Sequence, residues 1–208
     1  MTRGRFLAFE GGEASGKSTQ SARLAARLDA VLTREPGGTA VGAQLRSVLL
    51  DPATRLDDRA EALLMAADRA QHVAEVVAPA LAAGRHVVTD RYAGSSLAYQ
   101  GFGRGLPLDE VRRLSEWATG DLWPDVTLLL DVPVELAASR LTGRPDRLEA
   151  AGDDFHCRVH DGFRQIAREH PDSWVLVDGT LGPDEVEKLV WAAVVERCPD
   201  LRSSRAGR

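Results

Sequence analysis

The chain has 208 residues, of which 44% are hydrophobic and 27% charged, and its formal net charge is -5. This composition is that of an ordinary globular protein, and the length suits one α/β domain over residues 1–208. The acidic balance argues against a general nucleic-acid binder, and no apolar run is long enough to predict a membrane-spanning helix. Cys157 and Cys198 lack metal-site spacing, so we interpret them as free thiols of a cytoplasmic protein.

Short apolar runs alternate with amphipathic helical stretches along the chain. The predicted strands are Arg5–Phe9, Ala30–Thr33, His86–Asp90, Val126–Asp131 and Trp174–Asp178. Strands and helices in this order predict a three-layer α/β fold, with a five-stranded parallel sheet between helices. Pro183 suits the first turn of the last helix. The small, polar residues 202–208 are expected to form a frayed tail.

The stretch GGEASGKST lies between the first predicted strand and a helical segment. It fits the pattern G-x-x-x-x-G-K-[ST], in which backbone N–H groups and a helix N-terminus surround phosphate oxygens. In that pattern the lysine reaches the β- and γ-phosphates and the serine hydroxyl is placed for Mg²⁺. The predicted site for a nucleoside triphosphate consists of Gly11, Gly12, Glu13, Ala14, Ser15, Gly16, Lys17, Ser18 and Thr19.

Two further motifs begin where predicted strands end, namely TREPGG at 33–38 and TDRYAGSSLAYQG at 89–101. The carboxyl ends of parallel strands meet at one edge of the sheet, where ligands bind in open α/β folds. We therefore expect Arg34, Asp90 and Arg91 to face the same crevice as the phosphate loop. An isolated Asp–Arg pair is more often a surface salt bridge, but its occurrence at a strand end favours a function.

Two later segments add candidate binding residues. Met65 and Arg69 are four positions apart in a helical stretch, so they lie on one face and suit the floor and hydrogen-bonding fork of a flat site. Downstream, Arg140, Arg144 and Arg147 fall in a stretch broken by glycine and proline. A basic stretch of this kind beside a phosphate site predicts a mobile lid over about residues 140–153. A solvated charged loop is the alternative.

Together, these segments resemble the bacterial thymidylate kinases, a branch of the P-loop nucleoside monophosphate kinases. The resemblance rests on FEGGEASGKSTQ, TREPGGT, AADRAQH, DRYAGSSLAYQG and PDRLEAAGDDFHCRV, which occur in the family's order from Phe6 to about Pro171. It implies ATP-dependent phosphorylation of dTMP to dTDP in a homodimer, with Mg²⁺ as cofactor. The acceptor phosphate is already ionised at neutral pH, so catalysis would consist of positioning and charge neutralisation.

The resemblance also implies roles for particular residues. Lys17 and the loop backbone would hold ATP, while Ser18 and Asp90 would hold Mg²⁺. Glu13 would contact the 3′-hydroxyl of dTMP, which accounts for an acid inside an anion-binding loop. The other implied dTMP-binding residues are Arg34, Arg46 and Arg91 for the phosphate, Met65, Arg69, Ser96 and Gln100 for the base, and Tyr99 for the deoxyribose.

Two positions depart from the family's pattern. Some members carry an arginine in the phosphate loop where this chain has Ala14, and members without it carry a catalytic arginine in the lid. The resemblance therefore implies a catalytic set of Lys17, Arg91, Arg140, Arg144 and Arg147. Met65 stands where the family usually stacks a phenylalanine on thymine, which predicts looser selection among pyrimidines.

Two alternatives remain open at this point. One is a kinase of the same fold for another nucleotide or for a nucleoside. Arg69 and Gln100 argue against a nucleoside kinase, and Arg34 and Arg91 favour an acceptor that carries a phosphate. The other is a nucleotide-dependent switch or binding module. A GTP-dependent switch would need a guanine-reading N-K-x-D segment, which the sequence lacks.

Overall fold

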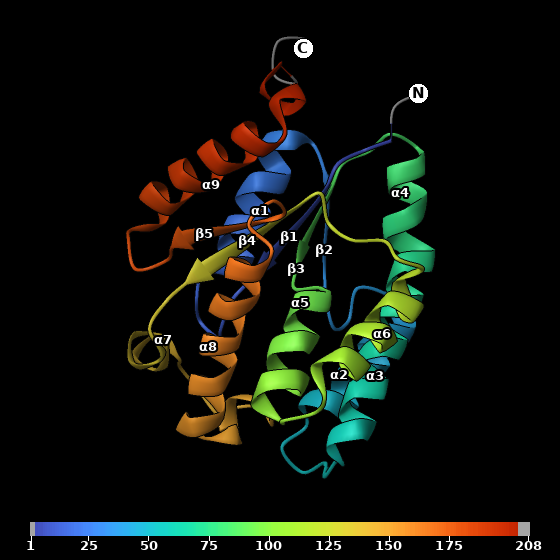
Figure 1. Ribbon diagram of the computed structural model, residues 1–208, viewed down its shortest axis with the longest axis vertical. Coiled ribbons are helices and arrows are strands. Elements are labelled where there is room, and N and C mark those ends of the chain that lie inside the picture. Colours follow the sequence, from blue (N-terminus) through green and yellow to red (C-terminus); the bar gives the residue numbers. More distant parts are fainter. Residues whose placement is uncertain (1–2, 204–208) are drawn as a thin grey trace.

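A computed structural model describes residues 3–203 (Figure 1). Within these residues, five parallel strands form one sheet in the order β2-β3-β1-β4-β5. The strands are β1 (Phe6–Glu10), β2 (Val31–Arg34), β3 (Val87–Asp90), β4 (Val126–Asp131) and β5 (Trp174–Asp178). Each lies within one residue of its predicted bounds, so the predicted fold class is confirmed.

Helices cover both faces of this sheet, as Figure 1 shows. The α-helices are α1 (Lys17–Leu28), α2 (Ala40–Leu50), α3 (Asp58–His72), α4 (Ala78–Ala82), α5 (Ala93–Ser96), α6 (Leu108–Thr119), α7 (Val134–Arg140), α8 (Asp153–Glu169) and α9 (Pro183–Arg197). Two π-helical segments, η1 (Val73–Val77) and η2 (Leu97–Gly103), continue α3 and α5, and two 3₁₀ turns are η3 (Glu149–Ala151) and η4 (Pro199–Ser203). Residues 204–208 of the expected tail lie outside the described part.

Alternate residues of the buried strands face the two helical layers. On β1, Leu7 and Phe9 pack with α1 and α9, whereas Phe6 and Ala8 pack with η1 and α4. Side chains of a strand point alternately to opposite faces, so a sheet covered on both sides needs continuous apolar runs. This requirement is why the five strands could be recognised in the sequence.

The register of the sheet aligns the ends of three strands. Asp90, the last residue of β3, pairs with Phe9 on β1 and with Arg34 on β2. The segments after β1, β2 and β3 therefore leave the sheet side by side. No helix of residues 3–203 is both long and apolar enough to cross a membrane.

Candidate active site

The phosphate loop connects β1 to α1 and bends through backbone conformations that favour glycine. Gly11 has φ +141°, and a Cβ there would lie 2.7 Å from the Leu130 carbonyl oxygen. Gly16, with φ +93°, precedes the first residue of α1. The loop thus ends at a helix N-terminus, which directs N–H groups and partial positive charge at the space above it.

Lys17 folds back over this loop. Its Nζ donates to the Gly12 carbonyl at 2.5 Å and to Ser15 Oγ at 3.2 Å. Burial and the neighbouring Arg91 guanidinium lower the pKa of Lys17 to about 8, although nearby carboxylates oppose the shift. The ammonium is therefore charged at neutral pH but close to its titration point.

An open cleft of about 790 Å³ lies above the loop. It is lined from the loop by residues 13–19, from the strand ends by Arg34, Asp90 and Arg91, and by Arg46 and Arg140. Gly11 and Gly12 do not line this cleft, and the Gly11 carbonyl accepts from Arg91 Nη1 at 2.9 Å. The cleft therefore brings together most of the residues that the sequence predicted for phosphate groups.

The two predicted metal-binding residues lie in contact with each other. Ser18 Oγ donates to Asp90 Oδ2 at 2.5 Å at the edge of the cleft. A hydroxyl and a carboxylate are the hard oxygen donors that Mg²⁺ prefers, and this ion usually takes only one or two protein ligands beside phosphates. No cluster of three or more potential metal ligands occurs among residues 3–203.

Arg91 is held by four side-chain hydrogen bonds. Nη1 donates to Gly11 and to Ser95 Oγ, while Nη2 donates to Glu13 Oε1 at 2.6 Å and to the Tyr99 hydroxyl at 3.1 Å. The Tyr99 hydroxyl in turn donates to Glu13 at 2.7 Å. Arg91 and Lys17 lower the pKa of Glu13 to about 2 despite its burial. Glu13 is thus an ionised acceptor held by Arg91 and Tyr99 where the cleft meets the space beside it.

The backbone of Arg91 has φ +71°, an uncommon conformation for a residue with a side chain. Its N–H donates to the Phe9 carbonyl at 2.9 Å, which fixes the turn at the end of β3. Arg46 approaches the cleft from α2, and its Nη1 donates to the Pro36 carbonyl at 2.9 Å. Burial and the positive charges of Arg34 and Arg91 lower the pKa of Arg46. This convergence of like charges indicates an anion site.

A second, narrower pocket adjoins the cleft. Glu13, Arg46 and Arg91 line both spaces, so they form a shared wall. The predicted base- and sugar-binding residues that line the second pocket are Met65, Arg69, Ser96, Tyr99 and Gln100. The structure thus gathers residues from α3, α5 and η2 that lie up to 35 positions apart in the sequence.

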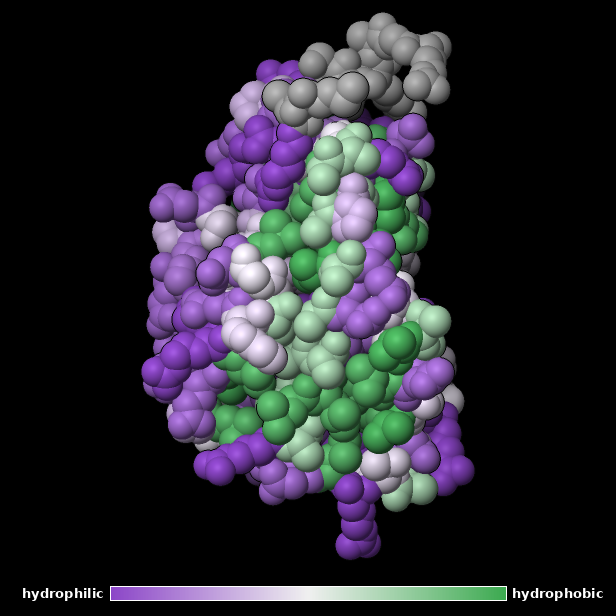
Figure 2. Space-filling model, turned by 90° about the vertical axis from the view of Figure 1, so that its right-hand side faces the viewer, coloured by the Kyte–Doolittle hydropathy of each residue, from purple (hydrophilic) through white to green (hydrophobic). Residues whose placement is uncertain are grey.

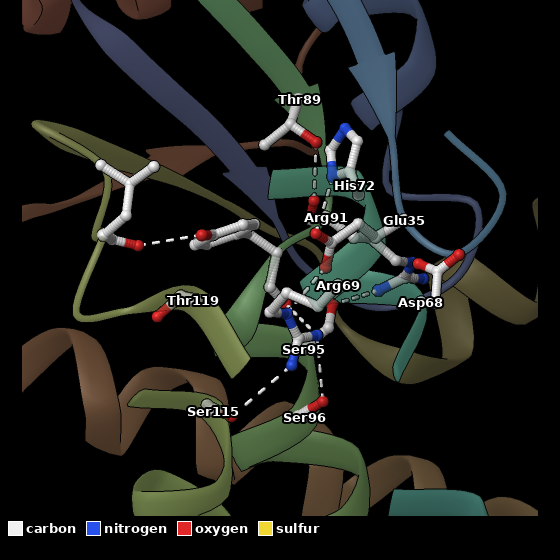
Figure 3. Close-up of polar contacts among 12 residues, drawn as sticks. Glu35, Asp68, Arg69, His72, Thr89, Arg91, Ser95, Ser96, Ser115 and Thr119 are labelled. Carbon is white, nitrogen blue, oxygen red and sulfur yellow. Dashed lines mark hydrogen bonds and ion pairs between the residues drawn. The ribbon is translucent and has the colours of Figure 1, made fainter. Parts of the chain in front are cut away.

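Arg69 lines this pocket with only 2% of its side chain exposed, and Figure 3 shows its polar contacts. Nε donates to Glu35 Oε2 at 2.8 Å, and Nη2 donates to the Tyr92 carbonyl at 3.2 Å and to Ser96 Oγ at 3.1 Å. Nη1 lies 3.5 Å from Ser115 Oγ. An arginine carries five N–H donors, so these contacts leave one for a ligand. Ser96, predicted to contact the base, is here a support for Arg69.

Several buried polar residues around Arg69 were not predicted from the sequence. Glu35 Oε1 lies 2.8 Å from His72 Nδ1, and His72 Nε2 lies 2.7 Å from Thr33 Oγ1. Asp68 Oδ1 accepts from the Gly37 N–H at 2.9 Å, and burial together with the charge of Glu35 raises the pKa of Asp68. These contacts tie α3 to the turn after β2. The signal was present in TREPGG, whose acid follows Arg34.

Glu10, the last residue of β1, is another buried acid that no motif in the sequence indicated. It accepts from the N–H groups of Tyr92 and Ser95 and from Ser95 Oγ, at 3.0, 2.9 and 2.6 Å. Burial raises the pKa of Glu10 to about 7, although its hydrogen bonds and Arg91 oppose this shift. Glu10 supports the start of α5 beneath the shared wall.

The three arginines of the predicted lid have different surroundings. Arg140 ends α7, lines the cleft, and donates to the Gly179 carbonyl at 3.1 Å. Arg144 lies in the exposed stretch 141–145. Arg147 instead donates to Glu61 Oε2 at 2.6 Å and to the Leu49 carbonyl at 2.7 Å. Arg147 therefore lies between two residues that line the second pocket, Asp146 and Leu148, whereas Arg140 lines the phosphate cleft.

The second part of the predicted lid is packed against the protein. Leu148 is 6% exposed, belongs to the core beside α8, and lines the second pocket together with Asp146. The Arg147 N–H donates to the Leu50 carbonyl at 3.1 Å. Asp146 and Leu148 thus form part of the pocket wall, whereas residues 141–145 are exposed.

A phosphate loop beside a second pocket, with two arginines that line both spaces, defines a P-loop kinase that acts on a small phosphate acceptor. Comparison with known proteins narrows this class. The family model described as thymidylate kinase matches residues 9–190. The chain belongs to the thymidylate kinase family.

Individual relatives agree with this assignment along nearly their whole length. Thymidylate kinase of Deinococcus radiodurans is 48% identical over 204 residues, covering 95% of this chain and 99% of its own. Thymidylate kinase of Synechococcus sp. strain JA-3-3Ab is 50% identical over 201 residues, covering 92% and 96%. The crystal structure of thymidylate kinase from Ehrlichia chaffeensis has a TM-score of 0.77 at 31% identity, covering 92% and 99%.

The buried contacts of Glu35 generate a stability prediction. Glu35→Ala leaves Arg69 and His72 without this partner in positions that are 2% and 0% exposed. Breaking a buried ion pair by removing one member costs about 3–5 kcal/mol, so the free energy of unfolding should fall by that amount in urea titrations. Glu75→Ala, at an exposed position, should change it by about 0.5 kcal/mol or less. Equal effects of both substitutions would contradict the role of Glu35.

Proposed function

We propose that this protein transfers the γ-phosphoryl group of ATP to dTMP, giving ADP and dTDP. The observation that supports this most directly is the wall shared by the cleft and the second pocket. A phosphoryl donor in the cleft and a nucleotide in the pocket would bring their phosphates together beside Arg91. The function is that of the family to which the chain belongs.

In this proposal the phosphate loop binds ATP through its N–H groups and Lys17. Arg34, Arg46 and Arg91 bind the phosphate of dTMP at the shared wall. The family assigns an acid at the position of Glu13 to the 3′-hydroxyl, and the Glu13 carboxylate lines both spaces, as that contact requires. Tyr99 lies against Glu13 and Arg91, where it would pack on the deoxyribose.

Mg²⁺ would be held by Ser18 and Asp90 together with the phosphates of ATP. When bound, this ion supplies positive charge that neutralises the phosphate oxygens. The chain's own residues hold the two phosphates in place and add further positive charge. Two unit charges about 4 Å apart repel by about 4 kcal/mol at an effective dielectric constant of 20, and the ammonium of Lys17 and the guanidinium groups offset this repulsion. The acceptor oxygen is already ionised, so no residue has to remove a proton.

The choice of nucleotide follows from the second pocket. The one N–H donor of Arg69 that has no protein acceptor suits a carbonyl oxygen of thymine or uracil. The amino group of cytosine would instead place two donors together. The alternatives of another monophosphate kinase and of a switch are not favoured, since the family match covers most of the chain.

A panel of nucleoside monophosphates tests the function. With ATP and Mg²⁺, ADP release should give the largest kcat/KM for dTMP, a value about tenfold lower for dUMP, and a far lower one for dCMP. Met65→Phe should widen the preference for dTMP over dUMP, because a rigid ring fits the base more tightly than a thioether. Equal use of dCMP and dTMP would contradict the base pocket. Stabilisation by ATP alone, with no turnover of any monophosphate, would favour a switch.

The lid arginines provide a second test. We propose that Arg140 supplies transition-state charge, because it lines the cleft and the loop has Ala14 instead of an arginine. Arg140→Ala should lower kcat by about 10³ with small changes in KM. Arg147→Ala should mainly raise the KM for dTMP, because Arg147 holds the pocket wall. Arg144→Ala serves as the matched comparison at an exposed position. A larger loss of kcat in Arg147→Ala than in Arg140→Ala would reverse this assignment.

The pKa of Lys17 predicts a pH dependence. A lysine binds phosphates in its charged form, which is lost as pH rises through its pKa of about 8. The kcat/KM for ATP reports the free enzyme and should therefore decline above about pH 8, rather than above the ordinary lysine range. In Lys17→Arg the side chain stays charged, so any residual activity should be level up to pH 9.5. A level wild-type profile to pH 9.5 would contradict the low pKa.

We also propose that the enzyme is a cytoplasmic homodimer. Figure 2 shows a broad apolar area on the side where α2, α3, α4 and α6 lie, and such areas are typical of interfaces. The large exposed apolar residues on these helices are Val41, Val48, Leu63, Leu108 and Trp117. The two cysteines are free thiols, as expected for a reducing compartment.

Sedimentation tests this assembly. The wild type should sediment as a dimer, and Leu63→Glu should yield monomers by burying a charge in the interface. Leu189→Glu, which places the same charge at an exposed position on α9, should leave the dimer intact. A monomeric wild type at micromolar concentration would contradict the proposal.

A further inference from the structure

Glu61 is a buried acid near the start of α3 that lies behind the second pocket rather than in its wall. Its side chain is 1% exposed and accepts hydrogen bonds from three residues. Oε1 accepts from Gln100 Nε2 at 2.8 Å, and Oε2 accepts from Arg104 Nη2 at 3.0 Å and from Arg147 Nη1 at 2.6 Å. Glu61 therefore connects Gln100, which lines the pocket, to Arg104 and Arg147, which do not line it.

The donors around Glu61 keep it ionised. Burial by itself favours the neutral acid, but Arg104, Gln100 and Arg147 together hold the pKa of Glu61 below its ordinary value. An ionised carboxylate only accepts hydrogen bonds. Arg104 is itself fixed, since its guanidinium lies 4.5 Å from the centre of the Phe155 ring. The Glu61 carboxylate is therefore fixed in position and acts only as a hydrogen-bond acceptor.

This character determines which way the Gln100 amide faces. The amide oxygen cannot point at a carboxylate without two acceptors meeting, so Nε2 must be the atom at 2.8 Å from Glu61. Oε1, on the other branch of the same amide, is directed away from Glu61. Gln100 lines the second pocket beside Met65 and Arg69. The atom that it can offer to a ligand is thus an acceptor.

We propose that Glu61 is a positioning residue for base selection, which fixes the Gln100 amide so that its oxygen accepts from the ring N–H of a pyrimidine. This inference rests on the proposed function, because it takes the second pocket as the dTMP base site. Thymine and uracil carry a hydrogen on N3, whereas cytosine has a lone pair there. An oxygen fixed at this point favours the first two bases and repels the third.

Glu61 acts in addition to Arg69 and by a different route. Arg69 offers a donor to the exocyclic oxygen, while Gln100 offers an acceptor to the ring nitrogen. If the Gln100 amide could rotate by 180°, it could accept from N3–H of thymine or uracil in one orientation and donate to N3 of cytosine in the other. Only a neighbour that cannot donate prevents this rotation, and Glu61 is that neighbour.

The test compares Glu61→Gln, Gln100→Met, the double variant and the wild type for kcat/KM with dTMP and dCMP. A glutamine at 61 can donate to a rotated Gln100, so the ratio of dTMP to dCMP should fall about tenfold. Gln100→Met should lower the ratio similarly, and adding Glu61→Gln should lower it no further. The ratio within one variant is independent of the fraction of folded enzyme. Glu196→Gln, an exposed position on α9, should leave the ratio unchanged.

Loss of Glu61 leaves Arg104 and Arg147 near each other without their carboxylate. Should Glu61→Gln fail to fold, Glu61→Gln combined with Arg147→Met removes one of these cations, and its ratio is compared with that of Arg147→Met alone. The same tenfold fall is expected. An unchanged ratio in the Glu61 variants, or a fall that simply adds to that of Gln100→Met, would overturn the inference. A wild type that does not use dTMP would instead overturn the proposed function.

Discussion

Glu13 and Arg91 come from the ends of two neighbouring strands, and their side chains meet at 2.6 Å between the two pockets. This contact holds the Glu13 carboxylate inside a loop that otherwise offers N–H groups. It also holds the side chain of Arg91, whose backbone adopts an uncommon left-handed conformation. Arg91 also contributes, after burial, to the lowered pKa of Lys17, and it lines both the cleft and the second pocket.

The fold and the phosphate cleft follow from short patterns in the sequence. A strand covered on both faces must be apolar throughout, so the five strands were predicted to within one residue of their bounds. The motifs at strand ends could be brought together for the same reason, since parallel strands in register place their carboxyl ends at one edge. Arg34, Asp90 and Arg91 were therefore expected in one crevice, and they line it.

The buried acids could not be predicted in this way. Glu61 and Asp68 lie on a helix whose apolar spacing suggests an ordinary amphipathic segment, and Arg147 lies in a stretch that was predicted to be a mobile lid. Glu61 and Arg147 are 86 positions apart in the sequence, so no local pattern could predict that they pair. A charged residue in the interior is stable only with its partners. The burial of these acids could therefore be inferred only once their partners were known from the structure.

The exposed stretch from Leu141 to Pro145 joins two segments that are each fixed independently, Arg140 at the cleft and Leu148 in the core. A Cβ at Gly143 would meet nothing within 4 Å. Insertions or deletions here would leave the walls of both pockets in place. A protease that cut the chain at this point would yield two fragments held together by the sheet and core. Chain length and continuity in this short connection therefore matter little to the architecture of the two pockets.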